Sequence, residues 1–184
     1  AATKHYDWLG GFVCGVAVAI GGGTIRDVML GLTPFWMSSP IYLLFTLLAQ
    51  LVVIVCHHYL KRLDNTWFLF DTLGLALFNI AGIQKTLDCG FPFWVAIIMG
   101  CITGSFGGVI RDVLLNEEPV IFRKEIYAMA CVIGGLVYWG FSCLDVSLYV
   151  TVVASFVTVC AIRLLAVKYH ISLPTLRDED EKDN

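Results

Sequence analysis

The chain has 184 residues, of which 58% are hydrophobic and 15% are charged, and its formal net charge is −3. Average proteins contain about 45–50% apolar and about 25% charged residues, so this composition excludes a soluble domain and favours an integral membrane protein. The acidic excess lies in the run Asp178–Asp183, and no stripe of basic residues indicates nucleic acid as a partner.

Six apolar segments follow one another along the chain, and they approach the roughly 20 residues that a helix needs to cross a bilayer. In chain order they are Tyr6–Leu32, Ile41–Leu60, Trp67–Gln84, Phe91–Leu115, Ile126–Leu144 and Val146–Val167. Their apolar runs are continuous rather than alternating, which favours helices over a β-barrel. We therefore expect an all-α integral membrane protein.

The first and fourth segments contain the same motif, 85 positions apart. Gly21–Pro34 reads GGGTIRDVMLGLTP and Phe106–Pro119 reads FGGVIRDVLLNEEP, and seven of nine positions are identical from Gly22 to Leu30. The chain is therefore an internal duplication. A helix precedes the motif segment in the second copy, so we expect its counterpart in the first copy to lie upstream of Ala1 and to be missing here.

The duplication predicts one membrane domain over residues 1–184, made of a first repeat (1–60), a second repeat (66–145), an extra C-terminal helix (146–168) and a cytoplasmic tail (169–184). The two motif helices are three crossings apart and must run antiparallel. This is an inverted repeat of three-helix units plus one helix (3+3+1), an arrangement that many transport proteins share.

The basic residues of the loops predict which side faces the cytoplasm. One side carries only Lys85, whereas the other carries Lys4, Lys61, Arg62, Arg123, Lys124, Lys168, Arg177 and Lys182. Because cytoplasmic loops are rich in Lys and Arg, the second side, which includes the C-terminus, is expected in the cytoplasm.

Glycines are clustered in both motif segments, Gly21, Gly22 and Gly23 in the first and Gly107 and Gly108 in the second. Glycine destabilises a helix interior by about 0.5–1 kcal/mol relative to alanine. We therefore predict kinked or interrupted helices, whose unwound backbone must be buried or line a hydrated cavity. The alternative is that the glycines only allow close helix packing, as small residues do in membranes.

An Arg-Asp pair follows each glycine cluster, Arg26-Asp27 in the first copy and Arg111-Asp112 in the second. A charge at the bilayer centre costs about 2.5–3.5 kcal/mol, so these residues are expected to face a cavity or each other. The inverted axis suggests crossed pairing, Arg26 with Asp112 and Arg111 with Asp27. With the glycines and Thr24, where a half-helix would begin, they form the candidate ion pathway. The alternative is a structural ion-pair cluster without a transport role.

Other polar residues have simpler interpretations. Asp71 suits the N-terminal end of the third helix, and Asn79 and Gln84 are expected to form helix–helix hydrogen bonds. Lys85 is expected to extend to the outer surface. Basic residues near the cytoplasmic helix ends are candidate contacts for lipid headgroups. They are Lys61, Arg62, Arg123, Lys124 and Arg163.

No motif indicates an enzyme or a cofactor. There is no Ser/His/Asp arrangement, no strand precedes the glycines as a phosphate loop requires, and His57-His58 lack further metal ligands nearby. The seven cysteines form no C-x-x-C pair and lie scattered in apolar segments, which is typical of lipid- or core-facing residues rather than disulfides.

Several of these motifs together resemble the prokaryotic branch of the trimeric intracellular cation (TRIC) channel family. They are DWLGGF, GGGTIRDVMLG, LFDTLGLALFNIAGIQK, GGVIRDVLLNEEP and RKEIYA, and the resemblance covers Asp7–Pro174. It implies a 3+3+1 plan, a homotrimer and one pore in each subunit, lined by the two motif helices kinked at their glycines. It also implies conduction of monovalent cations, chiefly potassium, in a bacterial or archaeal plasma (inner) membrane.

The chain departs from the family in two ways: the first helix is absent, and the Lys-Glu-Val motif of animal members is not evident, so their phosphoinositide site is not transferred. Two other functions stay open. The chain could be a secondary transporter of a small zwitterion such as glycine, with Arg binding the carboxylate and Asp the ammonium. It could also be a scaffold whose repeats only pack a trimer. Expected partners are further copies of the chain, membrane lipids and monovalent cations.

Overall fold

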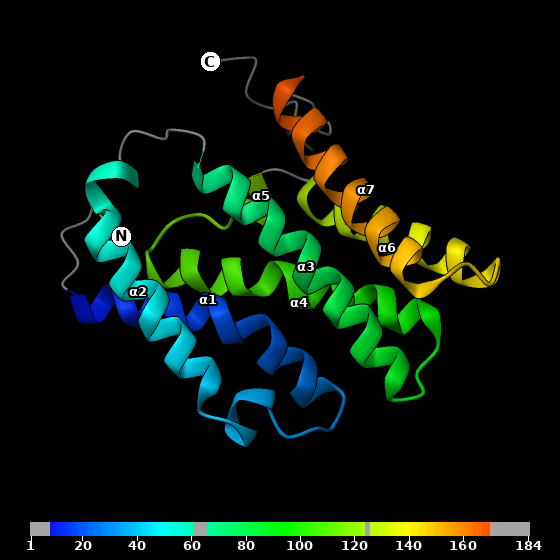
Figure 1. Cartoon of the computed structure of the whole chain (residues 1–184), viewed down its shortest axis with the longest axis horizontal. Helices are drawn as coiled ribbons and strands as arrows, with labels where there is room; N and C mark the ends of the chain where they lie inside the picture. The colour runs from blue at the N-terminus through cyan, green and yellow to red at the C-terminus, as the bar shows by residue number, and fades with distance from the viewer. Residues whose placement is uncertain (1–7, 61–65, 124–125, 170–184) are drawn as a thin grey trace, which may run out of the picture.

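The computed structural model describes residues 8–60, 66–123 and 126–169, and every element in these ranges is helical (Figure 1). The long helices are α1 (Trp8–Met29), α2 (Ile41–Leu60), α3 (Thr66–Asp88), α4 (Phe93–Leu114), α6 (Ile126–Cys143) and α7 (Leu148–Lys168). Two four-residue helices, η2 (Phe35–Ser38) and α5 (Val120–Arg123), follow α1 and α4. The expected all-α class is confirmed.

Four described helices, α1, α4, α6 and α7, are long and apolar enough to cross a membrane. The α2 helix contributes a shorter apolar stretch, Ile41–Val55, and α3 carries Asp71, Lys85 and Asp88. The α3 helix packs against α4, α6 and α7, so Asp71 meets protein groups rather than lipid. The chain is therefore a multi-pass membrane protein.

The α1 and α4 helices form a long antiparallel pair, and Figure 1 shows them running in opposite directions. The duplication extends to the turns that end these helices. The N–H of Gly31 donates to Val28, and the N–H of Asn116 donates to Val113, 85 positions later. Both turns use a left-handed residue, with φ 72° at Gly31 and 50° at Asn116. The fold is an inverted repeat, with α1 and α2 matching α4 and α6.

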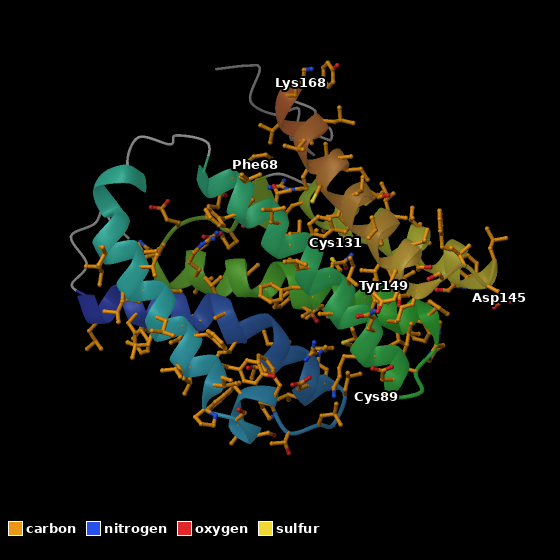
Figure 2. All side chains as sticks on the ribbon, viewed as in Figure 1. Phe68, Cys89, Cys131, Asp145, Tyr149 and Lys168 are labelled. Atoms are coloured by element: carbon orange, nitrogen blue, oxygen red, sulfur yellow. The ribbon has the colours of Figure 1, made fainter. Side chains whose placement is uncertain are left out.

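The buried apolar core lies among α3, α4, α6 and α7, around Leu75, Ile83, Cys131 and Val159 (Cys131 is labelled in Figure 2). The α2 helix instead exposes long apolar side chains over its described length, as far as Val55. An apolar exterior suits lipid tails or a neighbouring subunit. Within the described part of α1, the buried residues are Gly21, Gly22, Arg26 and Asp27.

The glycines interrupt neither motif helix. The α1 helix is continuous through Gly21–Gly23 and α4 through Gly107–Gly108, although Figure 1 shows α1 bending along its length. The prediction of an unwound half-helix beginning near Thr24 is therefore wrong. A glycine costs a helix only about 1 kcal/mol, and packing can offset that amount without breaking the helix.

What the glycines provide is a close crossing of α1 and α4. A Cβ atom on Gly22 would collide with the carbonyl oxygen of Thr103, and one on Gly107 would lie 2.6 Å from the carbonyl oxygen of Val18. A Cβ atom on Gly21 would lie 2.7 Å from the side chain of Ile110. Larger residues would push the two backbones apart, so these three positions fit the close-packing alternative.

Candidate functional site

Arg26 and Asp27 form a buried ion pair in the last turn of α1. The Nε and Nη2 atoms of Arg26 donate to Oδ1 of Asp27 at 2.9 and 2.7 Å. The Oδ2 atom of Asp27 accepts the backbone N–H of Phe35 at 2.8 Å, which ties η2 back to α1. Both carboxylate oxygens of Asp27 are therefore occupied.

The second motif makes the same contacts at the end of α4. The Nε and Nη2 atoms of Arg111 lie 2.8 Å from Oδ1 of Asp112, and Oδ2 of Asp112 accepts the N–H of Val120 at 3.1 Å. Each arginine thus pairs with its own neighbour in the sequence. The expected crossed pairing, Arg26 with Asp112 and Arg111 with Asp27, is wrong.

The crossing point of the two helices explains this result. At the crossing of α1 and α4, Gly22 faces Thr103 and Gly107 faces Val18, so the two arginines lie beyond it in opposite directions. Arg26 lies four residues after Gly22 and Arg111 eight residues after Thr103, so at 1.5 Å per residue the antiparallel helices separate the arginines by about 18 Å along their axes. The long arginine side chain instead folds back onto the adjacent carboxylate.

A cavity of about 330 Å³ lies beside the first motif. It lies among α1, η2, α2, α3 and α4, and the lining residues that matter here are Gly22, Gly23, Arg26, Phe35, Lys85 and Thr103. Lys85 is exposed near the end of α3, as expected for a residue at the surface. The cavity therefore brings two cationic side chains together on one side of the bundle.

Thr24 has a structural role next to this cavity. Its hydroxyl donates to the carbonyl of Ile20 at 2.6 Å and accepts the indole N–H of Trp36 at 3.0 Å. Thr24 thus helps to hold the turn after α1 and does not belong to the residues that line the cavity.

The described residues around the second motif form no comparable cavity at the matching position. The depression beside it is lined by Gly108, Arg111, Asp112 and Tyr127 and has no volume that admits a water molecule. The duplicated contacts therefore have different surroundings. A cavity lies beside Arg26, whereas side chains pack closely around Arg111.

Asp71 fills the Arg111 side. Its Oδ1 atom lies 3.9 Å from Nη1 of Arg111 and accepts the hydroxyl of Tyr127 at 3.3 Å. Its Oδ2 atom lies 3.3 Å from Nη2 of Arg163. The sequence predicted only a helix-dipole role for Asp71 and did not indicate this cluster, because Arg163 lies in α7, outside the repeated unit. We call Asp71, Arg111, Tyr127 and Arg163 the Asp71 cluster.

Arg163 is buried, with only 2% of its surface exposed, and it does not reach a lipid headgroup. Its guanidinium carbon lies 5.2 Å from the ring centre of Phe68 and 4.5 Å from that of Tyr127. These cation–π contacts and Asp71 replace water or lipid phosphate as partners, so the expected lipid contact of Arg163 is wrong. The other candidate lipid contacts lie outside the described side chains: Lys61, Arg62, Arg123 and Lys124.

The cavity and the Asp71 cluster lie at opposite ends of α3. Figure 2 labels Phe68 near the start of this helix and Cys89 just after its end. Asp71 lies near the start of α3 and Lys85 lies near its end. An inverted repeat of helices is an arrangement that many membrane transport proteins share.

The comparison with known families agrees with this class. Residues 1–58 and 68–142 match the family model described as glycine transporter, so the chain belongs to that family, which includes the TRIC-like proteins. The chain is 42% identical over 182 residues to the UPF0126 inner membrane protein YadS of Escherichia coli K12, covering 95% of this chain and 86% of YadS. It is 39% identical over 179 residues to a UPF0126 membrane protein of Vibrio cholerae, covering 95% and 74%.

Solved structures of TRIC channels have the same fold. One TRIC cation channel superposes with a TM-score of 0.87 at 34% identity, covering 97% of this chain and 89% of that channel. The TRIC orthologue from Rhodobacter sphaeroides has a TM-score of 0.79 at 30% identity, covering 90% and 96%. The family resemblance inferred from the repeated motifs is confirmed.

Proposed function

We propose that the protein is a channel for monovalent cations, permeable to potassium, in the inner membrane, with its C-terminus in the cytoplasm. The observation that carries this proposal is the fold shared with TRIC cation channels over 97% of the chain. Among these relatives, the Rhodobacter protein is described as a trimeric channel, so we propose a homotrimer with one pathway in each subunit.

The proposed pathway follows the α1–α4 pair. On the outer side, ions would enter the cavity beside Gly23 and Arg26. On the inner side, they would leave past Gly108 and Arg111, where the depression admits no water. The structure would then represent a closed channel, and conduction requires the Asp71 cluster to open.

A carrier of glycine is the second candidate. The description of the family model favours it. An open cavity beside Arg26 and a closed depression beside Arg111 also favour it, because an alternating-access transporter is open on one side at a time. However, both oxygens of Asp27 already accept hydrogen bonds from Arg26 and Phe35. Asp27 is also buried and does not line the cavity, so it is not placed to bind the ammonium group of a zwitterion there, and we favour the channel.

Single-channel recording of the purified protein in planar bilayers tests this choice. We expect discrete unitary currents whose reversal potential follows the potassium gradient. The same protein preparation is also reconstituted into proteoliposomes, and their uptake of radiolabelled glycine is measured. Saturable glycine uptake without unitary currents would support the carrier, and a stable trimer with neither activity would support a scaffold.

The oligomer is measured separately, by light scattering of the detergent-solubilised protein corrected for bound detergent. We expect the mass of three chains of 20.4 kDa each. A monomer that still conducts would contradict the proposed trimer, but it would support the proposed pathway within each subunit.

A further inference from the structure

We propose that the cavity beside Arg26 is a binding site for a small organic carboxylate. This goes beyond cation conduction and stands on the cavity itself, so binding can be measured whether or not the protein conducts. Three features of the cavity support this site: its charge, its hydrogen-bond donors and its aromatic walls.

The charge in and around the cavity is not balanced. Among the described residues, Arg26 and Lys85 both line it and no carboxylate does, while Asp27, outside the lining, pairs with Arg26. Lys85 forms no ion pair with any residue in the described ranges. The second copy differs, since Arg111 has both Asp112 and Asp71 as carboxylate partners. One excess positive charge in a partly enclosed site attracts an anion.

The cavity has donors for such an anion. Arg26 uses Nε and Nη2 for Asp27, and its Nη1 atom donates to no described residue. The ammonium of Lys85 supplies a second cationic donor in the same lining. Guanidinium and ammonium groups form their strongest hydrogen bonds with ionised acceptors such as carboxylates.

The walls favour an organic anion over an inorganic one. Three aromatic residues line the cavity, Phe35, Tyr42 and Phe78. Phe35 and Tyr42 form an edge-to-face pair with ring centres 4.6 Å apart. An alkyl group would bury apolar surface against these rings, whereas chloride and phosphate have no such group. The described lining contains no carboxylate for an ammonium group, so a simple carboxylate fits better than a zwitterion.

Isothermal titration of the purified full chain in detergent tests the proposal, with potassium butyrate as the probe. Ionic strength is held constant with potassium chloride. We expect butyrate to bind more tightly than acetate, and acetate more tightly than inorganic phosphate or glycine. Equal binding of phosphate and butyrate, or tighter binding of glycine, would overturn the proposal.

Lys85 is the residue to vary, because it is exposed and has no partner in the described chain whose loss would disturb folding. We expect Lys85→Gln to weaken butyrate binding about fivefold, the effect of losing a partly exposed ion pair, and Lys85→Arg to retain it. The matched control is Lys168→Gln, an exposed lysine stacked on Tyr169 at the other end of the bundle. Unchanged affinity in Lys85→Gln would place butyrate elsewhere and refute the site.

Discussion

At the scale of single residues, the glycines of the repeated motif act through their size. Neither Gly22 nor Gly107 has a positive φ, which in the described chain is confined among glycines to Gly31 and Gly90. Their importance lies in the missing Cβ atom, which lets the backbone of α1 touch the backbone of α4. A substitution therefore acts through steric overlap at the crossing.

We predict that Gly22→Ala destabilises the protein by about 1–3 kcal/mol, the usual cost of adding volume at a tightly packed position. The new methyl group would meet the carbonyl oxygen of Thr103, which belongs to backbone and cannot rotate away. Thermal unfolding of the purified protein, followed by circular dichroism, measures the change.

The matched control is Gly74→Ala in α3, where a Cβ atom would have no neighbour within 4 Å. Alanine is a better helix former than glycine, so this variant should be neutral or more stable. Equal losses of stability in Gly22→Ala and Gly74→Ala would show that the loss does not arise from the crossing of α1 and α4.

At the scale of helices, Asp71 joins elements that the duplication does not relate. It lies on α3 and contacts Arg111 on α4, Tyr127 on α6 and Arg163 on α7. Two arginines share this one carboxylate, and among the described residues no other carboxylate pairs with Arg163. Loss of the Asp71 charge should therefore loosen three helices at once on the closed side of the bundle.

We predict that Asp71→Asn raises the open probability of the channel about tenfold, within the range of typical coupling energies. Arg111 and Arg163 would then repel each other without a shared counter-charge. Recordings in planar bilayers check the result, and Asp88→Asn, an exposed aspartate at the other end of α3, is the control. A folded Asp71→Asn protein with unchanged or lower open probability would exclude the Asp71 cluster as the barrier.

The sequence predicted the helices and their antiparallel repeat because apolar length and a repeat of 85 positions are local, countable features. It also predicted the helix–helix hydrogen bond of Asn79, whose Nδ2 donates to the carbonyl of Cys131 at 3.2 Å. It did not predict the partner of Arg163, because that contact joins residues 92 positions apart and has no counterpart in the other copy. It also failed on the partner of Arg26, because the crossing point of two helices depends on packing in three dimensions.

At the scale of the whole molecule, the two ends of the bundle differ in exposed groups. Lys85, Cys89 and Cys143 lie near the ends of α3 and α6, and Asn116 lies in the turn after α4, at the opposite end. From the distribution of basic residues we propose that the Lys85 end lies outside. This orientation can be tested without a fusion protein, because Cys89 and Cys143 are both exposed.

We predict that a membrane-impermeant maleimide labels the protein on intact cells, and that the double variant Cys89→Ser/Cys143→Ser loses this labelling. Adding Asn116→Cys to the double variant should restore labelling only after the membrane is permeabilised. Mass spectrometry of the purified protein locates the label. Modification of Asn116→Cys on intact cells would reverse the proposed orientation.

Asp27 and Asp112 accept the same hydrogen bonds, from the preceding arginine and from a backbone N–H eight residues later. The helices that carry them nevertheless point to opposite faces of the membrane. One sequence motif therefore reaches the same local geometry whether its chain travels outward or inward. A half-length ancestor with this motif would have had to enter the bilayer both ways and pair with its own upside-down copy. After fusion of two such genes, each half could diverge. The first half has a cavity beside Arg26, and the second half has Asp71 as a second acidic partner of Arg111.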